Sequence, residues 1–457
     1  MDNLIITNAL VVNADRTQNA HIYLSGGKIL DLLPLGSQLP SDIQTIDASG
    51  FTVIPGGVDP HVHLHLPTPA GYSCDDFLNG SKSALAGGTT TIIDFVTPNR
   101  GQSLLEALQL RKLEAEASII DYSFHMGVTW WDSRLKHEIE HCIVNEGITS
   151  FKVYLAYKNS IGISFPDLEK IMQVVGYHGG VVTVHAEVGD EIERLQHWFL
   201  SQGKTSPLYH ALSRPPEVES IAVERVINLA KETNCRVYIV HTSTKGSVDL
   251  IKDAQSKGIK VFSETCPQYL LLNEDVYNQV FNKAAPYVIS PPIRSSEHSE
   301  ALWKGIQNQT IQTLATDHCP FNLVGQKDKG SNNFTLIPNG AGGIENRIQL
   351  MYKYGVATNK ISINQLVALV ATNPSSIFGL ASKGKIAPGY DADLVIWDFN
   401  KIKTISASHQ VSSCDTSIYE GLESQGLPLH TVINGKLLNN NYLNEHPSQG
   451  SLIFRSL

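Results

Sequence analysis

The middle of the chain alternates between short apolar runs and amphipathic helical stretches. Between Pro216 and Lys231, for example, apolar residues recur with helical spacing and predict a helix with one apolar side. Residues of that side are Val218, Ile221, Ala222, Val226 and Leu229. The strand-like runs begin near Thr52, Thr90, Asp121, Ser150, Val181, Arg236, Lys260 and Gln312. Eight such units in series predict an α/β fold, a closed (β/α)8 barrel of the triosephosphate isomerase type.

A doubly wound open sheet is the alternative architecture, but no Gly-x-Gly-x-x-Gly loop follows any of the apolar runs.

Both ends of the chain have a different pattern, with short predicted strands separated by turn residues. The far end includes a hairpin signal at Asn434-Gly435. We therefore expect a small β-sandwich formed by residues 1–52 and 384–457, which encloses a barrel of residues 53–383.

Composition limits the classes of function. The 457 residues carry a formal net charge of −9, and no clustered stripe of lysine and arginine is present, which argues against a nucleic-acid partner. No apolar run has the length of a membrane span, and the first eight residues do not resemble a signal peptide. Six scattered cysteines without Cys-x-x-Cys spacing suggest reduced thiols. These features predict a cytoplasmic protein.

Histidines, a lysine and an aspartate stand where the predicted strands end. Two of them belong to His61-Val62-His63, and alternate residues of a strand share a face about 6.6 Å apart. In barrels of this type, polar residues at the carboxyl ends of strands carry the chemistry. The residues expected on this rim are His61, His63, Lys152, His185, His241 and Asp317.

Each of these residues also has an ordinary structural interpretation. His185 and His241 could be core histidines bonded to backbone, and Asp317 could cap a turn. Lys152 is harder to explain in that way, because an ammonium inside a barrel is costly without a partner, although it could extend to the rim. A consistent account is that the Lys152 amine reacts with carbon dioxide. The resulting carbamate is an anion whose two oxygens can bridge two metal ions.

Segments across the whole chain resemble the dihydropyrimidinase and hydantoinase family of cyclic amidohydrolases. The segments that carry the resemblance are PGGVDPHVH (55–63), SFKVYLAYK (150–158), VHAE (184–187), IVHTS (239–243), ETCPQY (264–269), SPPIR (290–294), ATDHCPF (315–321), IPNG (337–340) and GKIAPGYDAD (384–393). Their joint order is far more specific than any one of them.

The resemblance implies a binuclear metal centre and a set of site residues. His61, His63, Lys152 and Asp317 would bind the more buried of two divalent ions, expected to be Zn²⁺. The carbamate of Lys152 would be shared with the second ion, whose further ligands would be His185 and His241. Tyr157 matches the family's phenolic donor to the developing oxyanion. Ser290 and Asn339 match positions that hold the substrate ring.

The implied reaction is the opening of a cyclic amide by a metal-bridging hydroxide. Asp317 would accept the proton and pass it to the departing ring nitrogen, and the product would be an N-carbamoyl amino acid. His65 stands where the dihydroorotase pattern has an arginine for the substrate carboxylate. A neutral histidine is a poor partner for a carboxylate, which favours dihydrouracil, dihydrothymine or a 5-substituted hydantoin, as in pyrimidine degradation.

Other interpretations stay open at this point. An allantoinase or a dihydroorotase-like enzyme is one alternative, and a noncatalytic oligomeric scaffold is a more distant one, since some relatives keep the fold without the metal ligands. His65 and Asn346 depart from the usual family pattern, and Asn346 would alter an ion pair with Arg347. The resemblance also implies a homotetramer.

Overall fold

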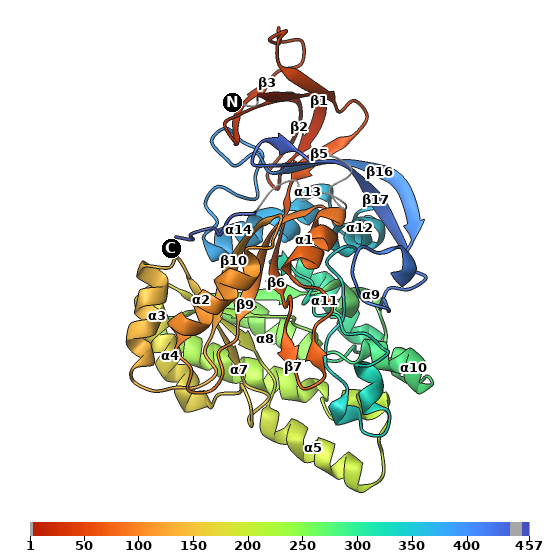
Figure 1. The fold of residues 1–457 in the computed structure, drawn as a ribbon. Coiled ribbons are helices and arrows are strands. Elements are labelled where there is room, and N and C mark those ends of the chain that lie inside the picture. The colour runs from red at the N-terminus through yellow and green to blue at the C-terminus, as the bar shows by residue number, and fades with distance from the viewer. Residues whose placement is uncertain (1–2, 439–449, 457) are drawn as a thin grey trace.

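The computed structural model describes residues 3–438 and 450–456, so residues 439–449 of the predicted third segment lie outside the described residues. Within these ranges, eight parallel strands form a barrel surrounded by helices (Figure 1). The barrel strands are β6 (Gly57–Val62), β9 (Thr89–Val96), β10 (Asp121–Gly127), β11 (Ser150–Tyr154), β12 (Val181–His185), β13 (Arg236–Ile239), β14 (Val261–Thr265) and β15 (Thr313–Leu314). This confirms the predicted fold class.

Contacts between the first and the last strand regions close the barrel. Val62 forms a parallel bridge with His318, and the N–H of His63 donates to the carbonyl of His318 at 2.8 Å. The longer helices are α1 (Phe77–Ala86), α2 (Leu104–Ala115), α3 (Leu135–Val144), α4 (Phe165–Tyr177), α5 (Gly189–Ser201), α7 (Pro216–Thr233), α8 (Lys245–Ser256) and α11 (Ser296–Gln307). Shorter helices are α6 (Pro207–Leu212), α9 (Pro267–Leu271), α10 (Phe281–Ala284), α12 (Arg347–Met351), α13 (Ile363–Val367) and α14 (Asn373–Phe378).

The predicted helix at 216–231 is present as α7, but one residue of its apolar side was assigned wrongly. Ile221 is 43% exposed, whereas Val218, Ala222 and Val226 are buried. The buried stripe also includes Glu219, whose carboxylate accepts hydrogen bonds from the loop after β13. Apolar spacing could not reveal this acidic member of the buried face.

A second sheet contains strands from both ends of the chain, which lie side by side at the top of Figure 1. Its order is β18-β17-β16-β5-β1-β2-β3, with β4 paired to β1. The strands are β1 (Leu4–Val12), β2 (Thr17–Ser25), β3 (Lys28–Leu33), β4 (Gln44–Asp47), β5 (Thr52–Pro55), β16 (Leu394–Thr404), β17 (Glu423–Ile433) and β18 (Lys436–Leu437). The predicted Asn434-Gly435 hairpin joins β17 to β18.

The first barrel strand begins later than the sequence suggested. The apolar run from Thr52 splits at Gly56: β5 pairs with β1 and β16 in the second sheet, and the barrel strand β6 starts at Gly57. A side chain at Gly56 would collide with Thr90, since an added Cβ would lie 2.1 Å from its hydroxyl. The chain therefore crosses from sheet to barrel within one residue.

A buried ion cluster fastens the second sheet to the barrel. The ammonium of Lys383 lies 2.5 Å from Asp121 at the start of β10 and 3.1 Å from Asp391, and it also pairs with Asp393 just before β16. The last described residues return to the barrel as well. Leu452 bridges Tyr122, and the buried Arg455 side chain donates to the hydroxyl of Ser150 at 2.8 Å.

Candidate functional site

Five of the six predicted ligand residues lie at or close to the carboxyl ends of barrel strands, and Lys152 lies in the middle of β11. His61 and Lys152 lie within β6 and β11, and His185 ends β12. His241 and Asp317 follow the ends of β13 and β15 and have left-handed backbone conformations, with φ of 37° and 53°. Such conformations are costly for residues other than glycine and tend to occur at functional sites. After these turns, ligand atoms of His241 and Asp317 lie within 4.8 Å of those of His61.

His61, His63 and Asp317 form the first group. The Nε2 atoms of His61 and His63 lie 3.2 and 3.3 Å from the same oxygen of Asp317. Ligand atoms of His61, His241 and Asp317 all lie within 4.8 Å of one another, which is a separation that one metal ion can span. Burial and the positive charge of Lys152 hold the pKa of His61 well below its usual range. Its imidazole is therefore neutral, as metal binding requires.

His185 and His241 form the second group. Nδ1 of His185 faces Nε2 of His241 at 3.0 Å, and burial lowers the pKa of both imidazoles. The other nitrogen of His185 lies 2.7 Å from the carboxylate of Glu187. Since a ligand histidine is usually oriented by a bond to its second nitrogen, Glu187 fixes the direction in which Nδ1 points.

Lys152 lies beside both groups and has no hydrogen-bond partner within the described part of the chain. Its side chain is 1% exposed, and Nζ is buried without an acceptor. The rings of Phe95 and Tyr154 lie 4.8 and 5.0 Å from Nζ. Burial lowers the pKa of Lys152 to about 8 and outweighs the attraction of Asp317 and Glu264. The amine is thus prepared to lose its proton.

Glu264 is a site carboxylate to which the sequence gave no role. It lies 2.6 Å from Nδ1 of His61, and it accepts hydrogen bonds from the hydroxyl of Tyr238 at 2.8 Å and the N–H of His241 at 2.9 Å. Burial raises its pKa to about 7. The signal in the sequence was its position at the end of a strand, within the ETCPQY segment.

Arg214, which sequence reasoning also missed, joins the second group to Tyr157. Its guanidinium donates to Glu187 at 2.5 Å and lies 5.5 Å from the centre of the Tyr157 ring. Burial alone would raise the pKa of Glu187, but Arg214 and His185 lower it to about 2. Tyr157 itself has a φ of 60° and its ring centre lies 5.4 Å from that of His185. The phenol is therefore beside the second group.

Ser290 and Asn339 lie on two loops that a buried lysine ties together. Nζ of Lys327 donates to the carbonyls of Val288 at 3.0 Å and Pro338 at 3.1 Å. Ser290 is 8% exposed and its hydroxyl has no partner among the described residues. Neither Ser290 nor Asn339 hydrogen-bonds to the six ligand candidates within that part of the chain.

The two departures from the family pattern have clear surroundings. His65 stacks on Tyr72 of the β7–β8 hairpin (Pro67–Thr68 and Gly71–Tyr72), with ring centres 4.0 Å apart. Asn346 accepts a hydrogen bond from Gln410, and the carboxylate near Arg347 is Asp59 at 3.9 Å. Asn346 has no charge with which to pair Arg347, and the effect of this departure stays a prediction.

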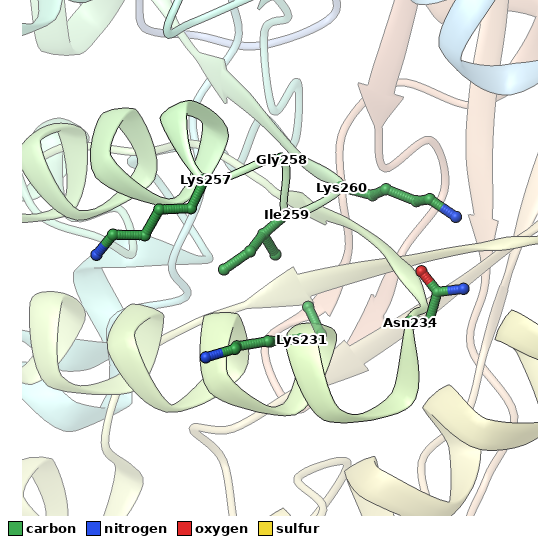
Figure 2. A pocket seen from close by; sticks show the side chains of 7 residues that line it. Lys231, Asn234, Lys257, Gly258, Ile259 and Lys260 are labelled. Carbon is green, nitrogen blue, oxygen red and sulfur yellow. The ribbon is translucent and has the colours of Figure 1, made fainter.

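A separate hollow of about 410 Å³ lies at the other end of the barrel strands, between the ends of α7 and α8. Its lysines are exposed. Figure 2 shows Lys231 and Lys257 extending to one side and Lys260 to the other. Their charges do not converge on a common point, so this hollow has no features of an anion site.

Comparisons with known proteins agree with this geometry. The model of the amidohydrolase family matches residues 52–438. A D-hydantoinase of Geobacillus stearothermophilus is 39% identical over 95% of this chain and 92% of that protein, and a dihydropyrimidinase of Rattus norvegicus is 37% identical over 96% and 85%. The crystal structure of a dihydropyrimidinase from Brevibacillus agri has a TM-score of 0.96 at 37% identity and covers 99% of both chains.

The same comparisons decide between the architectures considered for the sequence. An open doubly wound sheet would not superimpose on these structures over the whole length of both chains. No helix in residues 3–438 and 450–456 combines the length and apolar character of a membrane span. The chain belongs to the amidohydrolase family and, within it, to the group of D-hydantoinases and dihydropyrimidinases.

Proposed function

We propose that this protein hydrolyses the ring of 5,6-dihydropyrimidines or 5-substituted hydantoins and releases N-carbamoyl amino acids. The observation that carries the proposal is the gathering of His61, His63, His185, His241, Asp317 and Lys152 on one rim of the barrel. In a chain 39% identical to a D-hydantoinase over 95% of its length, this constellation supports the same class of reaction.

The donor set fits a pair of divalent metal ions, which we assign as zinc. Nε2 of His61, Nδ1 of His63 and Nζ of Lys152 are buried without hydrogen-bond partners among the described residues, and leaving such groups unpaired is costly. Imidazole and carboxylate ligands suit zinc. His61, His63 and Asp317 would hold one ion, His185 and His241 the other, and a carbamate on Lys152 would serve both. When bound, these ions activate water and polarise the substrate carbonyl.

Side chains of the protein would move the proton and stabilise the developing charge. Asp317 accepts the proton released as water attacks, and then delivers it to the departing ring nitrogen. The Tyr157 hydroxyl donates a hydrogen bond to the carbonyl oxygen, and this bond strengthens as negative charge develops there. Arg214 supports this role because it bonds Glu187 and lies over the Tyr157 ring. Backbone groups at Ser290 and Asn339 would hold the ring.

The surroundings of His65 bear on the choice of substrate. The imidazole is stacked on Tyr72, so it offers an aromatic wall rather than a bidentate cation for a carboxylate. We therefore assign a ring without an acidic substituent. The cytoplasmic location and the homotetramer stay predictions, as do the domain boundaries at 52/53 and 383/384.

The test is a substrate panel run with zinc analysis on the same preparation. We expect about two zinc ions per chain, with dihydrouracil or a 5-substituted hydantoin opened faster than allantoin and dihydroorotate. Loss of the far-ultraviolet absorbance of dihydrouracil follows the reaction. A metal-free and inactive protein would support the scaffold interpretation, and a preference for dihydroorotate would contradict the assignment of the substrate.

A further inference from the structure

Two cysteines lie together near the barrel mouth, outside the cluster of ligand candidates. Cys74 follows the β7–β8 hairpin, and Cys414 precedes β17 near the other end of the chain. The N–H of Cys74 donates to the carbonyl of Pro320 at 2.8 Å, and the thiol of Cys414 lies 3.4 Å from the next carbonyl, that of Phe321. Consecutive carbonyls therefore hold two cysteines that are far apart in the sequence.

The residues next to these cysteines are bonded directly to each other. Asp75 accepts hydrogen bonds from the N–H of Ser413 and the hydroxyl of Ser412, both at 2.7 Å. The thiol of Cys74 donates a hydrogen bond to Gln326 at 3.5 Å, and the two thiols lie near enough for each to affect the pKa of the other. The bonds between Asp75 and the two serines hold the Cys74 and Cys414 segments side by side.

We propose that Cys74 and Cys414 form a reversible disulfide when the protein meets hydrogen peroxide, so that the pair is a site of oxidative modification. The Cys414 thiolate attacks one peroxide oxygen, the O–O bond breaks, and the other oxygen leaves as water after taking up a proton. The Cys74 sulfur then attacks the sulfur of the Cys414 sulfenic acid. The S–S bond forms, the S–O bond breaks, and a second water leaves with the Cys74 proton. Two electrons pass from the thiols to the peroxide.

The surroundings favour Cys414 as the attacking sulfur. The neighbouring Cys74 thiol and Thr416 outweigh burial and lower the pKa of Cys414 to about 7. Reactive cysteines occur in such positions, whereas burial raises the pKa of Cys142 and Cys235 to about 12. Cys74 is partly exposed, which gives a small oxidant access to the pair.

The disulfide would connect the segment around the β7–β8 hairpin covalently to the C-terminal segment that contains Cys414. Cys74 follows the hairpin whose Tyr72 stacks on His65, and Asp75 also binds His318, the neighbour of Asp317. A covalent bond at Cys74 would therefore restrain residues 64–76. We expect their backbone amides to exchange more slowly with deuterium in the oxidised protein than in the reduced protein.

The test uses the full chain, freshly reduced and freed of reductant, with equimolar hydrogen peroxide near pH 7. Remaining thiols are alkylated, and the protein is digested without reductant for mass spectrometry. We expect a peptide pair linked through Cys74 and Cys414, equal rates of loss of the two thiols, and complete recovery with dithiothreitol. Cys74→Ser and Cys414→Ser should each abolish the linked pair, whereas the matched control Cys142→Ser should retain it.

Two results would overturn the proposal. One is conversion of Cys414 to sulfinic acid while Cys74 stays fully alkylatable. The other is a linked pair that forms only after the protein has been unfolded in denaturant. The mapping of the unaltered chain does not depend on the folding of any variant. It also needs no hydrolase activity, so it is independent of the proposed function.

Discussion

Two buried lysines of this protein have opposite surroundings. Lys383, between the barrel and the second sheet, contacts the carboxylates of Asp121, Asp391 and Asp393. These partners outweigh burial and raise its pKa above the usual range. Lys152, on the barrel rim, has aromatic rings beside it and no hydrogen bond within the described part of the chain, and burial lowers its pKa to about 8.

These different surroundings indicate that Lys383 acts as a structural cation and that Lys152 has a reactive amine. A buried ammonium is tolerated when carboxylates neutralise it, and Lys383 meets that condition. Lys152 does not, although Asp317 and Glu264 are near enough to act on it electrostatically. A buried lysine without a bonded partner carries the free-energy cost of an unpaired polar group. Conversion of its amine to a metal-binding carbamate would remove that cost. We therefore expect Lys152 to control activity and Lys383 to control stability.

The largest expected effect is that of Lys152→Ala on hydrolysis. Without the shared ligand the metal centre should be lost, and activity should fall on the order of 10³-fold or more, because metal polarisation contributes several kcal/mol. Zinc analysis and dihydrouracil hydrolysis measure both effects, and the exposed Lys170→Ala serves as control. A small carboxylic acid should partly restore metal and activity. Full activity of Lys152→Ala without additive would contradict the assignment.

Lys383→Met should show the reverse pattern, with a loss of stability and normal turnover. Removing the cation leaves buried aspartates unpaired, which should lower the free energy of unfolding by about 3 kcal/mol or more. Denaturant unfolding measures this loss. The control is Lys385→Met, which breaks the partly exposed pair with Asp15 and should cost less than about 1 kcal/mol. Equal losses for both variants would mean that the buried cluster has no special role.

A smaller effect on catalysis is expected for Arg214→Lys. A lysine keeps the charge but has no planar group that can bond Glu187 while lying over the Tyr157 ring, so His185 loses its fixed orientation. Because such supporting contacts typically contribute 10–100-fold, kcat and the retention of the second metal ion should fall by about that factor. Arg194→Lys, at an exposed pair with Glu191, is the matched control. A rise in KM alone would make Arg214 a substrate-binding residue instead.

The rim residues were predictable from the sequence because their types are unusual at the ends of apolar runs. His61, Lys152 and His185 mark strand ends clearly, and alternation of strand and helix gave the barrel. The start of the first barrel strand was predicted wrongly, because the apolar run from Thr52 continues through Gly56 into a different sheet. Local pattern does not encode which sheet a strand joins.

The supporting residues could not be derived in that way. Glu264 and Arg214 act through contacts with residues distant in the sequence, and a single glutamate or arginine has no periodicity that would mark it. The pairing of Cys74 with Cys414 has the same origin, since only the fold brings the two segments together. Sequence pattern therefore indicated the candidate metal ligands, whereas the residues that support them were found only from their contacts in the folded structure.

The smallest effect expected is a pH dependence of stability with opposite sign at the two lysines. Lys383 has a folded pKa above its unfolded value of about 10.4, so its contribution is complete below pH 10 and declines as the pH rises further. Lys152 in chelated, metal-free protein has a folded pKa of about 8, so stability should increase as the pH rises from 8 to 10. Each slope is at most about 1.4 kcal/mol per pH unit.

Denaturant unfolding of the chelated protein between pH 7 and about pH 11 measures these slopes against Lys383→Met and Lys152→Ala. The difference between the unaltered protein and Lys383→Met should stay constant up to about pH 10 and then shrink. Lys152→Ala lacks the titrating amine, so the stability of the unaltered protein should rise relative to this variant from pH 8 to pH 10. The difference between the unaltered protein and Lys152→Ala should therefore grow in that range. If both differences changed in the same direction, the two lysines would share one kind of environment, and the separation of a structural cation from a reactive amine would fail.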